Sequence, residues 1–178
     1  MKFAIAILLQ SCIFFTSAQA IKNTSYISAS GEKVLRLETV LPVNKATAWK
    51  YFTKDTLLKK WIAPLAHIEL KAGGYILTNY NENKSLDDSS SIKLNVINYL
   101  DEELLTLKVN LNNNFPAEIK NDDKNLQEII QFKDAGNGHT QVISSMTGWG
   151  KGTYWNKAYG FFVNGNTWTY EQLHKIFE

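Results

Sequence analysis

Apolar and β-branched residues recur in seven short segments, several of which alternate apolar and polar positions in the manner of half-buried β-strands. These segments cover residues 34–41, 67–71, 75–80, 92–97, 105–111, 126–133 and 140–147. Between two of them, residues 112–125 are polar and contain Pro116, which predicts a long loop with room for one short helical turn.

Two short helices are expected directly after the first strand. Asn44 can cap a helix over residues 45–53, and Asp55 can cap a second helix that Pro64 ends. Both helices would follow Pro42, the residue at which the first strand stops.

The hydrophobic period changes near the C-terminus. From residue 153 to residue 177, large apolar residues fall three or four positions apart, which predicts one long helix. Gly160 and Gly165 weaken this helix, since each costs about 1 kcal/mol relative to alanine. The order of elements therefore predicts an α+β fold, in which a curved antiparallel sheet wraps around a long C-terminal helix.

The first twenty residues have the pattern of a secretory signal peptide. Lys2 precedes an apolar run, and the segment ends in Ala18-Gln19-Ala20, which predicts cleavage after Ala20. A lipoprotein cut before Cys12 fits less well, because the apolar stretch continues beyond it. We therefore expect a signal peptide over residues 1–20, a flexible leader over residues 21–33, one domain over residues 34–178, and a periplasmic or secreted product.

Composition narrows the classes of partner. Among 178 residues, 19 Lys and Arg against 17 Asp and Glu give a net charge of +2, and Arg36 is the only arginine. This balance argues against nucleic acid as a partner. Cys12 is the only cysteine, so no disulfide framework is expected, and no apolar run after the signal segment is long enough for stable membrane insertion.

Several local motifs occur in a recognisable order. They cover residues 41–53, 57–61, 73–76, 140–150 and 155–173. In this order they resemble the START/Bet v 1-like (SRPBCC) superfamily, and within it the branch named after the activator of Hsp90 ATPase. The resemblance spans residues 34–177 and implies a helix-grip fold, with two short helices after the first strand. An exported chain would not meet a cytosolic chaperone, so the role in the branch's name is not expected here.

The resemblance also implies a hollow between the sheet and the long helix, which suits a small hydrophobic ligand. The residues that we expect to line it come from the second helix, two strands and the long helix. They are Trp61, Ile76, Met146, Tyr159, Phe162 and Trp168. Ordinary core packing remains the alternative for each aromatic residue. Which face of residues 75–80 points inward is left open, because both faces are apolar.

The sequence carries no metal-binding or cofactor motif, and its three histidines are scattered. Many relatives place a titratable residue where this chain has Met146, whose thioether cannot exchange a proton. We therefore expect a binding protein without cofactor or metal. The alternatives are a cyclase- or hydrolase-like enzyme on an aromatic or polyketide-like substrate, and a protein-interaction module.

Overall fold

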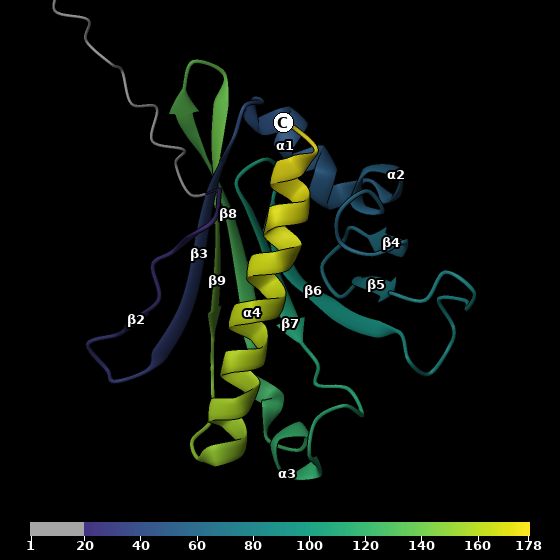
Figure 1. The fold of residues 1–178 in the computed structure, drawn as a ribbon, viewed down its shortest axis with the longest axis vertical. Helices are drawn as coiled ribbons and strands as arrows, with labels where there is room; N and C mark the ends of the chain where they lie inside the picture. Colours follow the sequence, from purple (N-terminus) through teal and green to yellow (C-terminus); the bar gives the residue numbers. More distant parts are fainter. Residues whose placement is uncertain (1–19) are drawn as a thin grey trace, which may run out of the picture.

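All seven predicted strands are present and form one antiparallel sheet (Figure 1). The structure is a computed structural model that describes residues 20–178. The seven strands are β3 (Lys33–Leu41), β4 (Leu65–Glu69), β5 (Tyr75–Asn79), β6 (Ile92–Leu100), β7 (Leu104–Val109), β8 (Gln127–Gly136) and β9 (His139–Thr147). The predicted signal peptide, apart from its last residue, lies outside the described residues.

The sheet places the first and last long strands side by side. The order of these strands is β3-β9-β8-β7-β6-β5-β4, so β3 pairs with β9, which comes about a hundred residues later in the chain. From β4 to β9 each strand neighbours the next in sequence, as consecutive antiparallel strands usually do.

Residues 21–33 differ from the flexible leader that the sequence predicted. Two short strands, β1 (Lys22–Asn23) and β2 (Tyr26–Ile27), pair antiparallel with β3. Ile21 is only 2% exposed and belongs to the hydrophobic core. The polar composition of the segment hid this role, because its pairing uses backbone groups that any residue carries.

Four helices are present in the described chain, together with one 3-10 turn. They are α1 (Lys45–Thr53), α2 (Asp55–Leu58), α3 (Ala117–Lys120), the 3-10 turn η1 (Asp123–Asn125) and α4 (Thr153–Lys175). Asn44 caps α1 as predicted, since its side chain accepts a hydrogen bond from Thr47 N at 2.9 Å. Asp55 does not cap α2; its carboxylate instead accepts the backbone N–H of Ile68 at 2.9 Å.

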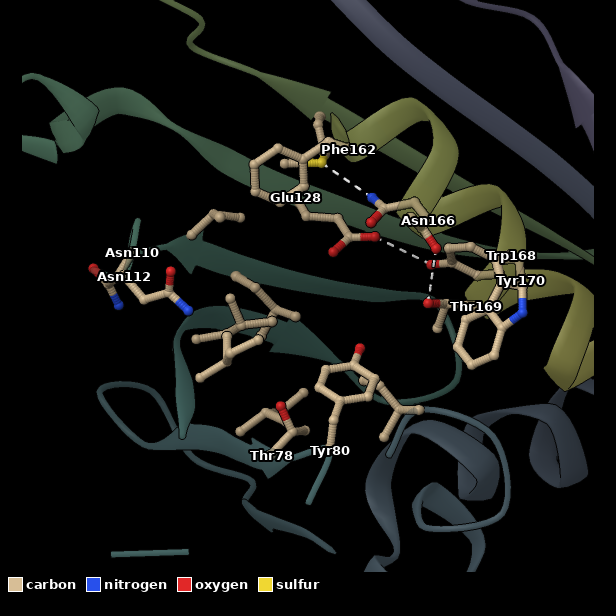
Figure 2. A pocket seen from close by; sticks show the side chains of 18 of the residues that line it. Thr78, Tyr80, Asn110, Asn112, Glu128, Phe162, Asn166, Trp168, Thr169 and Tyr170 are labelled. Atoms are coloured by element: carbon tan, nitrogen blue, oxygen red, sulfur yellow. Dashed lines mark hydrogen bonds between the residues drawn. The ribbon is translucent and has the colours of Figure 1, made fainter. Parts of the chain in front are cut away.

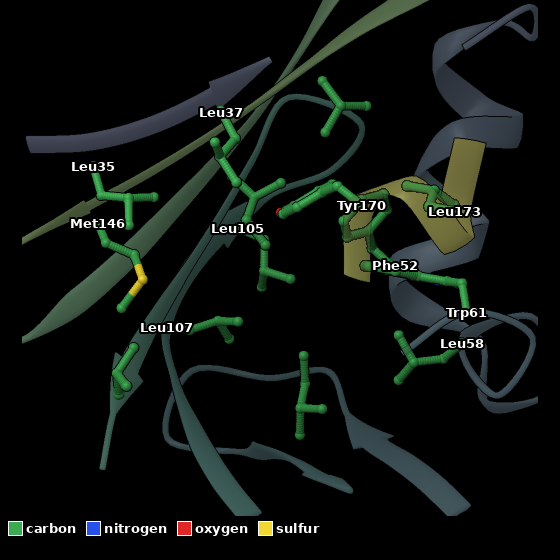
Figure 3. Packing of buried hydrophobic residues seen from close by; sticks show 14 of the residues in the cluster. Leu35, Leu37, Phe52, Leu58, Trp61, Leu105, Leu107, Met146, Tyr170 and Leu173 are labelled. Carbon is green, nitrogen blue, oxygen red and sulfur yellow. The ribbon is translucent and has the colours of Figure 1, made fainter. Parts of the chain in front are cut away.

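Helix α4 crosses one face of the sheet, and the inward side chains of the strands meet it there (Figures 1 and 3). Leu35 and Leu37 of β3, Leu105 of β7 and Leu173 of α4 are all at most 1% exposed. Alternation along each strand selects one apolar face, which explains why the core lies on one side of the sheet.

Two glycines fix how the chain enters α4. Gly148 has φ +82°, and a Cβ there would lie 1.9 Å from the carbonyl oxygen of Asn125. At Gly150 an added Cβ would lie 2.1 Å from Nε1 of the buried Trp155. Only glycine allows this turn, so the turn sets the position of the helix over the sheet.

Candidate functional site: a cavity between the long helix and the sheet

A cavity of about 340 Å³ lies between α4 and the inner face of the sheet (Figure 2). Its walls come from strands β5 to β9, from helices α1, α2 and α4 and from the loop around Phe115. Volumes of this size are typical of small-molecule sites, and the walls are mostly apolar, as such sites usually are.

Five of the six predicted residues line this cavity: Trp61, Ile76, Met146, Phe162 and Trp168. Tyr159 does not line it. Its ring packs edge-on against Trp149 with 5.1 Å between centroids, and the ammonium of Lys33 lies 5.4 Å from the ring. Trp149 lies in the turn before α4 and packs against Tyr159. Helical spacing alone could not predict that contact.

The inward face of β5 is now defined. Ile76 and Thr78 line the cavity and are 3% and 5% exposed, whereas Tyr75 and Leu77 occupy the opposite face of the strand. The cavity therefore meets one apolar and one hydroxyl side chain from this strand.

Trp168 lies at the mouth of the cavity. It lines the cavity, yet 52% of its surface is exposed, and Phe161 and Tyr80 combine the same two properties. Because about half of the ring is exposed, truncating Trp168 should cost less than the about 3–5 kcal/mol that removal of a fully buried aromatic ring costs.

Gly165 leaves a gap in the wall that α4 contributes. A Cβ added at this position would have no neighbouring heavy atom within 4 Å. The next residue, Asn166, donates from Nδ2 to the sulfur of Met146 at 3.2 Å (Figure 2). The small and polar residues of α4 thus face the hollow.

Glu128 is a titratable cavity residue that the sequence did not predict. Its Oε1 atom accepts hydrogen bonds from Ser144 Oγ at 2.6 Å and from the Tyr170 hydroxyl at 3.2 Å. Burial raises the pKa of the Glu128 carboxyl, although these two bonds act in the opposite direction. Burial, followed by the negative charge of Glu128, raises the pKa of Tyr170 well above its ordinary value.

Alternation along β8 carried a signal for Glu128. Glu128, Ile130 and Phe132 share one face of the strand, and the last two are buried. Ile129 on the other face obscured this pattern. Met146 itself cannot exchange a proton, but its cross-strand partner Glu128 places a titratable group in the hollow.

His67 lies outside the cavity and contacts Asp55. Its Nδ1 lies 2.7 Å from Asp55 Oδ2. Burial raises the pKa of Asp55, but the hydrogen bonds from His67 and Ile68 outweigh it, so that the pKa is lowered. Among residues 20–178, no group of three or more His, Cys, Asp or Glu side chains is placed to hold a metal ion.

The fold and the enclosed hollow define a helix-grip-like α+β domain of the SRPBCC superfamily. More narrowly, the chain belongs to the family described as activator of Hsp90 ATPase homolog 1-like protein, whose model matches residues 42–178. None of the curated proteins compared with the chain matches it. Within the described part of the chain, no helix has both the length and the apolar character needed to cross a membrane.

Solved structures share this fold at low sequence identity. A conserved protein of unknown function from Enterococcus faecalis matches with a TM-score of 0.63 and 15% identity, covering 88% of this chain and 77% of its own. CalU16 from Micromonospora echinospora matches with a TM-score of 0.63 and 11% identity, covering 89% and 84%. An Hsp90 activator from Plasmodium falciparum matches with a TM-score of 0.52 and 13% identity, covering 74% and 88%.

Proposed function

We propose that this chain is an exported, non-enzymatic binding protein that holds a small hydrophobic or amphipathic molecule between α4 and the sheet. The observation that carries the proposal is the cavity of about 340 Å³ with mostly apolar walls. Side chains that border a hollow lose packing contacts, and a bound apolar molecule would restore them. The same type of ligand is typical of the superfamily fold.

The exported location rests on the sequence. Lys2, the apolar run and the Ala18-Gln19-Ala20 ending form a signal-peptide pattern, and the chain after Ala20 contains no cysteine that could mispair in an oxidising compartment. Mass spectrometry of the native product should find Ile21 as the first residue. A product that begins at a lipidated Cys12 would instead place the protein on a membrane.

Binding can be tested with an environment-sensitive apolar dye. We expect saturable uptake at a stoichiometry of about one to one, with a negative heat-capacity change from apolar burial. Gly165→Leu should reduce the affinity at least tenfold, because the new side chain enters space that is open in the native protein. The larger residue should cost little stability, since the space is free and glycine is itself a poor helix former.

Gly160→Leu is the matched control. Gly160 lies in the same helix and also has no heavy atom within 4 Å of an added Cβ, but it does not line the cavity. Equal loss of dye binding in both variants would mean that the dye binds elsewhere. If the wild-type protein binds no dye at all, the proposed binding function fails and a protein-interaction module becomes the first candidate.

An enzyme is the second candidate, and Glu128 is the observation that favours it. A carboxyl group with a raised pKa inside an apolar cavity is suited to proton transfer. Hydrolysis of a chromogenic aromatic ester that is lost in Glu128→Gln, with dye affinity unchanged, would support catalysis. Absence of turnover in a protein that binds the dye would support the binding function.

A further inference from the structure

The second oxygen of the Glu128 carboxylate is free and reaches open space. Both hydrogen bonds to this carboxylate end on Oε1, and Oε2 has no partner among residues 20–178. Within that range, the only enclosed side-chain nitrogen or oxygen without a hydrogen bond is Arg36 Nε. Oε2 is therefore accessible, and because Glu128 lines the cavity, the cavity is the space it reaches (Figure 2).

No cationic side chain of the described residues lines this cavity. Its titratable side chains are Glu128, Tyr80 and Tyr170. Burial raises the pKa of both tyrosines, so these phenols remain neutral near pH 7. No ion pair in the described chain includes Glu128. An ionised Glu128 thus has two hydroxyl donors but no counter-charge in a mostly apolar space, which is an unfavourable arrangement.

We propose that the cavity selects an amphipathic molecule with a protonated amine, whose N–H group donates to Glu128 Oε2 while its apolar part fills the hollow. This inference rests on the proposed binding function and names its substrate class. An ammonium supplies both the missing counter-charge and a charge-assisted hydrogen bond. An anionic head group would meet the carboxylate as a like charge, and an alcohol would bring no charge. Ile76, Leu107 and Phe162 provide apolar surface for the remainder of the molecule.

Three probes of one chain length test this inference: n-octylamine, n-octanol and n-octanoate. Trp61 and Trp168 line the cavity, so tryptophan fluorescence reports occupancy without a dye. We expect octylamine to bind at least tenfold more tightly than octanol, and octanoate to bind most weakly. Glu128→Gln should abolish the preference for the amine, so that octylamine and octanol bind with similar affinity.

Glu118→Gln is the matched control for net charge. Glu118 is an exposed residue of α3 outside the cavity lining, and its replacement removes the same charge without touching the site. This variant should keep the full preference for octylamine. Equal loss of preference in both variants would overturn the inference and assign the effect to the overall field of the protein.

The pH dependence of wild-type binding gives a second test that needs no variant at Glu128. An alkylammonium keeps its proton across the acidic range, and Tyr80 and Tyr170 stay neutral there, so a change in affinity reports Glu128. Octylamine affinity should fall as the pH falls and the carboxylate gains a proton, whereas octanol affinity should stay constant.

The outcomes separate the inference from the function on which it rests. If octanol binds and octylamine binds no better at any pH, the amine specificity is overturned and the binding function stands. If neither the probes nor the apolar dye bind, the binding function itself fails.

Discussion

The inner face of the sheet has a packed end and a hollow end, and both lie under the same helix. At the packed end, Phe132 of β8 contacts Phe52 and Trp49 of α1, with ring centroids 4.9 and 5.2 Å apart. At the hollow end, Gly165 of α4 faces the cavity beside Met146. Both ends carry large apolar residues, so composition does not distinguish them.

The two ends differ in what covers them. Helix α1 contacts β8 and β9, and its aromatic side chains fill the space that α4 leaves at the packed end. At the hollow end α4 contributes small and polar residues, Gly165, Asn166 and Thr169, which leave the space open. The aromatic side chains of α1 thus make the core solid at one end, and the small and polar residues of α4 leave space for a ligand at the other.

Truncating a side chain at the packed end should have the largest effect on stability. Phe132 is 3% exposed, and Phe132→Ala should lower the free energy of unfolding by about 3–5 kcal/mol, because it removes a buried ring and leaves a void. Urea denaturation monitored by circular dichroism measures the difference. A cost below about 1 kcal/mol would mean that this end is as loosely packed as the other.

Truncating a side chain at the mouth of the cavity should reduce the free energy of unfolding by less. The Trp168 side chain is 52% exposed. Trp168→Ala therefore removes only the buried half of its apolar area, and the free energy of unfolding should fall by roughly 1–2 kcal/mol. The same denaturation experiment applies, with Phe132→Ala as the reference. Equal costs for the two variants would show that Trp168 closes over the cavity in solution.

The Glu128 carboxyl should make the free energy of unfolding depend on pH. Burial raises its pKa above the ordinary value of 4.5, so the folded state holds a proton that the unfolded state releases. The free energy of unfolding should therefore fall as the pH rises through the range above about 4.5, by at most about 1.4 kcal/mol per pH unit.

Glu128→Gln should flatten this slope, and the comparison of the two proteins from about pH 5 to about pH 8 measures it. Asp55 and Asp88 act in the opposite direction, since their pKa values are lowered, to about 2 for Asp88. Their contributions are lost at lower pH, below the range that reports Glu128. A slope that is identical in both proteins would show that Glu128 titrates normally.

The sequence predicted the fold better than it predicted the cavity. Apolar segments, several of them alternating, predicted the seven strands from β3 to β9, and helical spacing predicted α4, because burial of one face imposes a period on the sequence. The five predicted residues that line the cavity came from the resemblance to a known superfamily, since an apolar side chain beside a void has the same sequence pattern as one in a solid core.

Two features of the site were not predicted from the sequence. Tyr159 has the helical spacing of a cavity residue, but its ring packs against Trp149 instead. That contact depends on the turn before the helix. Glu128 shares one face of β8 with the buried Ile130 and Phe132, but it follows Gln127 at the polar start of the strand, where a charged residue more often faces water. The segment at residues 21–33 was hidden for a different reason, since it joins the sheet through its backbone.

The position of that N-terminal segment bears on the order of events during maturation. Ile21 is enclosed in the core, and the carbonyl oxygen of Ala20 accepts a hydrogen bond from Thr39 Oγ at 2.9 Å. A peptidase acts on an extended and accessible chain, so cleavage after Ala20, as proposed, must come before this segment docks onto β3. Removal of the leader and closure of the sheet edge would then be consecutive steps, with the edge strand completed last, after transport.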